Sequence, residues 1–354
     1  MSEHHHSHLW PGVPLALGSA VLFGASAPLS KLLMGSVDPW LLAGILYLGA
    51  GAGLSLLHWG RPLLDLPPVE ASLQRSDLPW LAAVIAFGGL LGPLFLMLGL
   101  SRTTAASGSL LLNLEGLATM AIAWIVFREN VDRRLLLGAA AILCGAVLLS
   151  WNGQALRLGT GELFIAAACL CWGIDNNLTR KLSLADPVQI AMVKGVVAGC
   201  TNFALALSLG AVLPGLDLIA AGAVVGFFGI GVSLVMFMLG LRHLGTARTG
   251  AYFSLAPFIG AVLALGLFHE PVTWQLLAAG LLMAFGLWMH LSERHDHWHD
   301  HDVLEHDHAH SHDGHHRHAH DGPTLEPHTH WHRHEPMRHK HPHYPDLHHR
   351  HTHG

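Results

Sequence analysis

Long apolar segments follow one another along most of this chain, and they constrain its fold more than any other feature. Each is about 17 to 25 residues long, the length that a helix needs to cross a bilayer. Only 12% of the residues are charged, against roughly 25% in an ordinary soluble domain. The sequence therefore predicts an all-α polytopic membrane protein in contact with the lipid bilayer. Its ten predicted transmembrane helices are residues 12–33, 40–58, 80–100, 105–127, 134–151, 160–181, 187–209, 217–240, 247–268 and 272–291.

The first five predicted spans resemble the last five. Moved by 149 positions, the segment Phe23–Lys31 falls on Trp172–Arg180, and an offset of 141 places residues 127–131 on 268–272. A duplication explains these matches. Because five is an odd number, the second copy enters the membrane from the opposite side. We therefore predict two inverted five-helix repeats, an arrangement that secondary transporters use.

This organisation predicts on which side of the membrane the ends of the chain lie and how the chain divides into parts. With the N-terminus in the cytoplasm, most Lys and Arg residues that flank the spans lie on the cytoplasmic side, as the positive-inside rule requires. An even number of spans returns the C-terminus to that side. We expect the cell inner membrane as the location. The predicted parts are a short His-containing tail (1–11), the first repeat (12–151), a linker (152–159), the second repeat (160–291) and a histidine-rich cytoplasmic tail (292–354).

Short motifs in equivalent helices of the two repeats carry a family resemblance. They are Phe23-Gly24 with Lys31, Trp172-Gly173 with Arg180-Lys181, Leu114-Glu115 running to Phe127-Arg128-Glu129, and Leu255-Ala256-Pro257 running to Phe268-His269-Glu270. Over residues 12–291 the chain resembles the drug/metabolite transporter superfamily, in its ten-helix branch with two EamA-type repeats. Gly116 stands where that family commonly has a proline. The resemblance implies a secondary transporter, often an exporter, and leaves the substrate open.

Other classes of protein fit the sequence poorly. It contains no HExxH, no GxSxG and no nucleotide-binding loop, the motifs that would indicate common kinds of enzyme. We therefore expect no enzymatic activity, no required cofactor and no nucleic-acid partner. A homodimer is compatible with the sequence, which does not identify the oligomeric state.

Ionisable residues inside the predicted spans are the first candidates for a functional site, because each costs roughly 2.5 to 3.5 kcal/mol at the bilayer centre. Asp175 shares one helix with Asn176 and Thr179, so a carboxylate, an amide and a hydroxyl lie close together. Two interpretations stay open for Asp175. It forms a substrate or proton site, or it pairs with Lys194 on the next helix and only fixes their packing.

Glu115 has no residue of opposite charge nearby in the sequence. An unpaired carboxyl group in a low-dielectric medium favours its neutral form, which suits a proton carrier; the alternative is a structural, hydrogen-bonding glutamate. Asn202 continues the helix face of Lys194. The predicted substrate or coupling-ion pathway consists of Glu115, Asp175, Asn176, Thr179, Lys194 and Asn202.

Most of the 31 histidines lie in the C-terminal tail, where they alternate with acidic residues. Histidine-rich tracts are typical of binding sites for Ni, Co or Zn. The tail has too few apolar residues to form a core, so we expect it to be disordered. Alternatives are a solvated tail with incidental metal affinity and a pH sensor. The predicted metal ligands are His295, His297, His299, His301, His306, His308, His310 and His312.

These features favour proton-coupled export of a divalent transition-metal ion, with the tail collecting or sensing the ion. The scarcity of imidazole ligands within the spans weakens this hypothesis. An alternative is an exporter of an organic metabolite or amino acid, in which the tail is regulatory or incidental. A membrane-anchored metal store without transport activity fits ten spans less well.

Overall fold

The computed structural model divides the chain into two compact units, Met1–Glu293 and Arg294–Gly354, and the first unit is built from helices. The residues that the structure describes are 12–60, 73–127, 133–151, 159–179, 182, 186–244, 246–291, 295–301, 304–310, 328–334 and 337–343. Of the sequence-based expectations, those for residues 1–11, most of the linker, Arg128, Glu129, Arg180, Lys181 and His312 lie outside these ranges.

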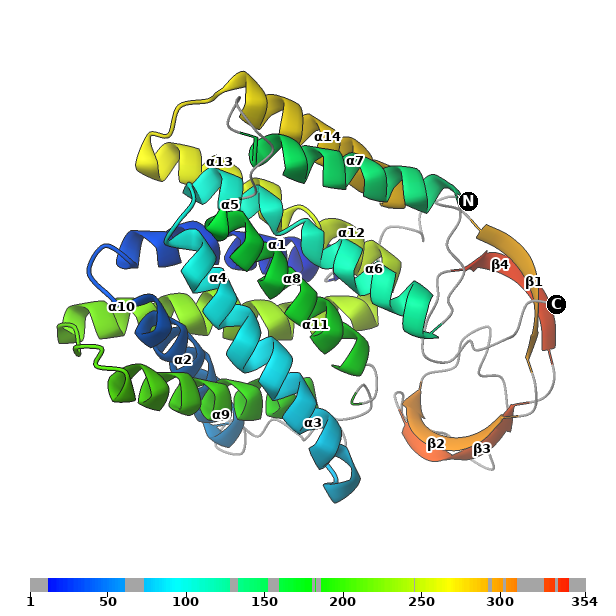
Figure 1. The fold of residues 1–354 in the computed structure, drawn as a ribbon. Coiled ribbons are helices and arrows are strands. Elements are labelled where there is room, and N and C mark those ends of the chain that lie inside the picture. The colour runs from blue at the N-terminus through cyan, green and yellow to red at the C-terminus, as the bar shows by residue number, and fades with distance from the viewer. Residues whose placement is uncertain are drawn as a thin grey trace. The chain divides into compact units, whose positions relative to one another are not determined.

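The helices of the first unit follow the order of the predicted spans (Figure 1). The first half contains α1 (Gly12–Leu33), α2 (Pro39–Gly60), the 3-10 turn Arg75–Asp77, α3 (Leu78–Val84), the π-helical segment Ile85–Leu91, α4 (Gly92–Leu100), α5 (Ala105–Leu111), α6 (Leu114–Phe127) and α7 (Arg133–Leu149). The second contains α8 (Thr160–Thr179), α9 (Pro187–Ser208), α10 (Leu216–Gly226), the π-helical segment Phe227–Val232, α11 (Ser233–Leu244), α12 (Thr246–Phe253), α13 (Ala256–Phe268) and α14 (Trp274–Leu291).

Among the described residues, seven helical stretches are long and apolar enough to cross a membrane. They are Gly12–Leu33, Pro39–Gly60, Arg75–Leu100, Ala105–Val126, Pro187–Ser208, Leu216–Gly240 and Trp274–Leu291. Helices also occupy the other predicted ranges, but α7 and α13 have only 17 and 13 residues, and α8, which contains Glu162 and Asp175, is not apolar enough. The chain is thus a polytopic membrane protein, and the count of ten spans stays a prediction.

The second helix of each half begins at an Asp-Pro pair. Asp38 Oδ1 accepts hydrogen bonds from the backbone amides of Trp40 at 2.9 Å and Leu41 at 3.2 Å. Asp186 Oδ1 accepts one from Val188 at 2.8 Å. The first amides of a helix lack partners within it, and aspartate at the N-cap supplies one. Proline is tolerated directly after the cap because it needs no such partner.

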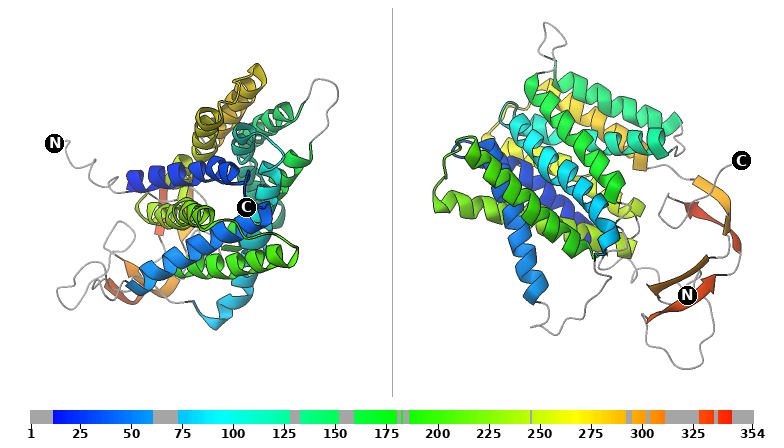
Figure 2. Two further views of the ribbon diagram at one scale, coloured as in Figure 1. Left: turned by 90° about the vertical axis from the view of Figure 1, so that its left-hand side faces the viewer. Right: turned by 60° about the horizontal axis from the view of Figure 1, so that its bottom comes forward.

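The two halves contact each other through a reciprocal set of helix pairs. The second helices, α2 and α9, lie side by side (Figure 2, left), as do the last helices, α7 and α14 (Figure 1). The remaining pairs are exchanged. Helix α1 packs on α11 and α13 of the second half, whereas α8 packs on α4 and α6 of the first. The first helix of each half therefore packs on the equivalent third and fourth helical segments of the other half.

Glycines allow the two like-with-like pairs to approach closely. A Cβ on Gly195 of α9 would lie 2.6 Å from the backbone nitrogen of Gly51 in α2, and one on Gly286 of α14 would lie 2.5 Å from the carbonyl oxygen of Gly138 in α7. Real Cβ atoms do not come so near. Small residues at these crossings permit the backbone contact that drives helix association in lipid.

The described residues of the second unit form four strands, where the sequence analysis expected disorder: β1 (His295–His301), β2 (Leu304–His310), β3 (His328–His334) and β4 (Met337–His343). Strand β1 pairs antiparallel with β4, and β2 with β3. Residues alternate between the two faces of a strand, so the two-residue spacing of the histidines is compatible with this conformation. The register places His297 opposite His341 and His308 opposite His330.

Candidate functional site

A buried ion pair joins two neighbouring helices in the first unit. Lys194 Nζ of α9 lies 2.5 Å from Asp175 Oδ2 of α8, and only 12% and 8% of the two side chains are exposed. Thr179 lies one turn beyond Asp175 and donates its hydroxyl to Asp175 Oδ1 at 3.4 Å. The pairing that the sequence suggested is present. It neutralises both charges within the apolar part of the protein.

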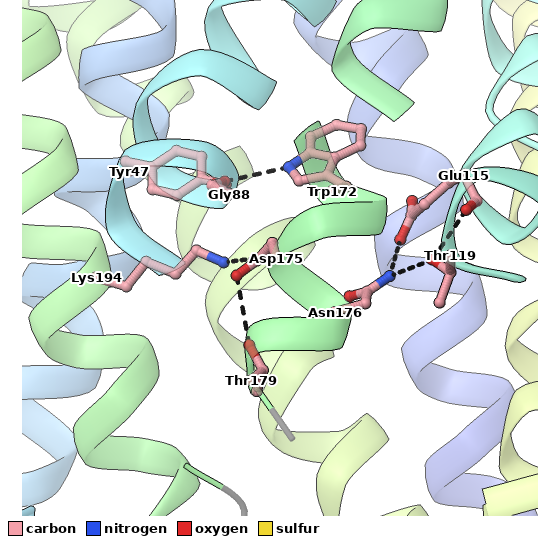
Figure 3. A network of polar contacts seen from close by, with 9 residues as sticks. All are labelled: Tyr47, Gly88, Glu115, Thr119, Trp172, Asp175, Asn176, Thr179 and Lys194. Atoms are coloured by element: carbon pink, nitrogen blue, oxygen red, sulfur yellow. Dashed lines mark hydrogen bonds and ion pairs between the residues drawn. The ribbon is translucent and has the colours of Figure 1, made fainter. Parts of the chain in front are cut away.

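The π-helical segment Ile85–Leu91 lies against this pair, and its carbonyl groups accept bonds from side chains. Gly88 O accepts the Tyr47 hydroxyl at 2.9 Å and the Trp172 indole Nε1–H at 3.1 Å (Figure 3). The next carbonyl, of Gly89, accepts the Asn202 amide at 3.3 Å. In π-helical geometry the usual i-to-i−4 bonding is interrupted, so carbonyls become available to outside donors. Donors from α2, α8 and α9 thus meet at one short segment.

Gly88 also makes room for the ion pair itself. A Cβ at this position would overlap the Asp175 carboxylate and crowd the Lys194 ammonium group. The absence of a side chain therefore allows the backbone of the π-helical segment to lie against the two charged groups.

Glu115 forms a second polar group, at the start of α6. Its Oε1 accepts the Asn176 side-chain amide at 3.0 Å, and the same amide nitrogen lies 3.2 Å from Thr119 Oγ1 (Figure 3). The Thr119 hydroxyl donates to the Glu115 backbone carbonyl at 2.9 Å. Glu115 is half-buried, whereas Asn176 is exposed. Among the described residues no cation forms an ion pair with Glu115.

The two groups are neighbours because Asp175 and Asn176 are adjacent residues of α8. Asp175 points to Lys194 on one side and Asn176 points to Glu115 on the other (Figure 3). With every group ionised, these side chains hold two negative charges and one positive charge. A net negative charge in an apolar medium is costly.

The predicted pathway residues thus lie in one region of the first unit, and their roles stay predictions. Sequence reasoning did not identify Tyr47 or Gly88, because nothing in the sequence marks a π-helical segment or its donors. Among the described residues no group of three or more His, Cys, Asp or Glu side chains could hold a metal ion. Of the predicted tail ligands, His295–His301 and His306 to His310 lie in β1 and β2.

A third polar contact links the halves at an end of the helices. Glu270, which follows α13, accepts hydrogen bonds from the backbone amides of Ala105 at 2.8 Å and Ala106 at 3.1 Å, at the start of α5. His269 has a left-handed backbone conformation, with φ of 52°. Lys31, at the end of α1, donates to the carbonyl of Leu100, the last residue of α4, and to that of Thr103, in the loop before α5.

Comparison with known proteins agrees with this helical architecture. An uncharacterized transporter of Methanothermobacter thermautotrophicus is 28% identical over 79% of this chain and 86% of its own. A probable amino-acid metabolite efflux pump of Salmonella typhimurium is 24% identical over 78% of this chain and 93% of its own. One solved crystal structure has the same fold, with a TM-score of 0.58 at 19% identity over 79% of this chain and 95% of that one.

The family itself is identified by two matched stretches, each covering one half of the helical unit. The model of the EamA-like transporter family matches residues 10–151 and again residues 159–292. Together these stretches span most of the 354 residues. The chain therefore belongs to the EamA-like transporter family.

Proposed function

We propose that this protein exports a small organic metabolite whose cationic amine binds at Glu115. The observation that carries the proposal is the Glu115 carboxylate, which is bonded to the exposed amide of Asn176 at 3.0 Å and has no ion pair among the described residues. The neighbouring Asp175 is already neutralised by Lys194. A solute ammonium group would supply the missing positive charge and form a charge-assisted hydrogen bond.

The proposed architecture is ten spans in two inverted repeats, in the cell inner membrane with both ends in the cytoplasm. The repeated family match and the reciprocal helix pairing support it. In inverted repeats, rocking of one half against the other opens a central site alternately to each side. Glu115 and Asn176 are suited to such a site because they join α6 of one half to α8 of the other.

The proposed coupling ion is a proton, which competes with the amine for Glu115. A carboxyl group that binds only one of the two at a time links their movements in opposite directions. Asn176 donates to the carboxyl group, and Thr119 accepts from the same amide and donates to the Glu115 backbone carbonyl. The similarity to a probable amino-acid metabolite efflux pump of Salmonella typhimurium supports a nitrogen-containing organic cargo.

A second candidate function is export of Ni, Co or Zn, and the histidine-rich tail favours it. All the described tail residues lie in strands, and the register of these strands sets histidine opposite histidine at several positions, as at His299 and His339. Within the spans the ion would pass on carboxylate, amide and water ligands. The described part of the chain offers no cluster of three metal-binding side chains, so we place the amine first.

Transport by the purified full-length chain in proteoliposomes separates these functions. We expect counterflow of labelled methylamine, and Glu115→Gln should reduce it to the level of protein-free liposomes. Glu162→Gln is the matched control, because Glu162 lies in the first turn of α8, away from Asn176. Glu162→Gln should transport normally. If the wild type takes up Ni but not methylamine, and Glu115→Gln loses the Ni uptake, the amine proposal is refuted and the metal function is established.

A further inference from the structure

We infer that the solute also carries an apolar, preferably aromatic, group, which packs on a series of four aromatic residues that begins one helical turn of α8 from Asn176, the partner of Glu115. This inference rests on the proposed function and narrows its substrate to amphipathic amines. The four residues, called the aromatic wall below, are Phe23, Trp172, Phe237 and Phe253, from α1, α8, α11 and α12.

The rings of the aromatic wall form a continuous series across both halves. Phe23 meets Trp172 edge to face with 6.4 Å between ring centroids. Phe253 lies 5.2 Å from Phe23 and 4.7 Å from Phe237. Phe23 and Trp172 are equivalent residues of the two repeats, at the offset of 149. The wall therefore lies where the halves meet, which is where a secondary transporter holds its substrate.

The wall differs from the closed core of the protein. Among the described residues, the buried hydrophobic side chains are aliphatic or sulfur-containing, with Tyr47 as the one aromatic exception. The four wall residues are only half-buried. Each ring therefore keeps part of its surface free for another apolar group, although it touches rings from other helices.

The separation between Trp172 of the wall and Asn176, the partner of Glu115, determines how far apart the amine and the apolar group of the solute must be. Trp172 and Asn176 are separated by one helical turn on the same side of α8, about 6 Å along the axis. Trp172 is fixed by its bond to Gly88 O, and Asn176 by its bond to Glu115 (Figure 3). A solute with an amine at Glu115 and an apolar group roughly one turn away contacts both. Aromatic rings bind apolar and cationic groups alike.

The test compares two amines of equal charge, methylamine and 2-phenylethylamine, in proteoliposomes of the full-length protein, with passive leak subtracted from protein-free liposomes. We expect the wild type to prefer 2-phenylethylamine in kcat/KM. Phe23→Ala and Phe253→Ala should each reduce that preference on the order of tenfold, as expected for loss of an apolar contact. The loss should fall mainly on 2-phenylethylamine, which alone of the two amines carries a ring. Trp172→Phe, which keeps a ring, should retain most of the preference.

Phe285→Ala is the matched control, since Phe285 is 51% exposed on the outer helix α14; its preference should equal that of the wild type. Elution as a single species and unchanged thermal unfolding establish that each variant is folded. An unchanged ratio of the two amines in folded Phe23→Ala and Phe253→Ala overturns the inference and leaves the amine exporter intact. Glu115→Gln that transports both amines normally overturns the proposed function instead.

Discussion

Lys194 and Asp175 form an ion pair of 2.5 Å between α9 and α8, in which each side chain is almost completely removed from solvent. Two neighbouring residues fit around the pair. Thr179 bonds the second carboxylate oxygen, and Gly88 leaves the space that both charged groups occupy. A buried pair of this kind is costly to disrupt from one side, because the remaining charge has no partner.

Removing one member of this pair should therefore destabilise the protein strongly. We expect Lys194→Met and Asp175→Asn each to lower the free energy of unfolding by about 3 to 5 kcal/mol. The double variant should recover most of the loss, because it leaves no uncompensated charge. Denaturant unfolding of the four proteins in detergent measures this as a double-mutant cycle. Additive losses would contradict the coupling.

The same double variant distinguishes the two roles that the sequence left open for Asp175. If the pair only fixes the packing of α8 on α9, the stable double variant should transport at the wild-type rate. If the pair belongs to the substrate pathway, transport should be lost although the protein is folded. Proteoliposome transport by the double variant gives the answer, with Asp38→Asn, at the start of α2, as a control outside the pair.

We expect Gly88→Ala to lower the thermal stability of the protein and Gly116→Ala to preserve it. A methyl group on Gly88 collides with the Asp175 carboxylate, whereas a methyl group on Gly116 has no atom within 4 Å. Alanine also favours a helix over glycine by about 1 kcal/mol, so Gly116→Ala should match or exceed the wild type in thermal stability. Gly88→Ala should unfold at a lower temperature. Equal unfolding temperatures for the two variants would mean that the π-helical segment accommodates the methyl group.

The sequence predicted the helical segments and gave the Asp175–Lys194 pair as one of two interpretations, because both depend on short-range patterns. Apolar length marks a helix, and two opposite charges on consecutive helices have few other partners. The contact between Glu115 and Asn176 was not predicted, since it joins residues 61 positions apart. Which residue of α6 faces Asn176 depends on how α6 packs on α8. The sequence lists both residues as candidates but cannot place them together.

The π-helical segment illustrates a second limit. Residues 85–91 have the composition of an ordinary apolar helix. Their altered hydrogen bonding accompanies donors on three other helices, at Tyr47, Trp172 and Asn202. Such a feature arises only after the helices pack, and no local sequence pattern indicates it. The role of Glu270 as a cap for α5 was missed for the same reason, because its partners lie in the other half.

Glu270→Gln should weaken the contact between the halves at the start of α5. The carboxylate accepts two backbone amide bonds there, and the glutamine side chain has one acceptor oxygen and no charge. Loss of a capping group costs about 0.5 to 2 kcal/mol. We expect a lower unfolding temperature in detergent. The control is Glu162→Gln, because Glu162 accepts only a 3.4 Å bond from Thr103. This variant should lower the unfolding temperature less. An equal effect of the two variants would contradict the capping role.

The histidine-rich tail should bind metal independently of transport by the helices. Histidine lies opposite histidine at alternate positions of the β2–β3 pair, as at His308 and His330, and imidazole binds Ni, Co and Zn. We expect Ni binding by the full-length protein in calorimetry and its loss in a chain cut after Arg294. Acidification should weaken binding, because protons compete for the imidazole nitrogens. Methylamine transport by the shortened chain should equal that of the full-length protein. If the cut abolishes amine transport while the helices remain folded, the tail takes part in transport, and its metal affinity would then be a means of control.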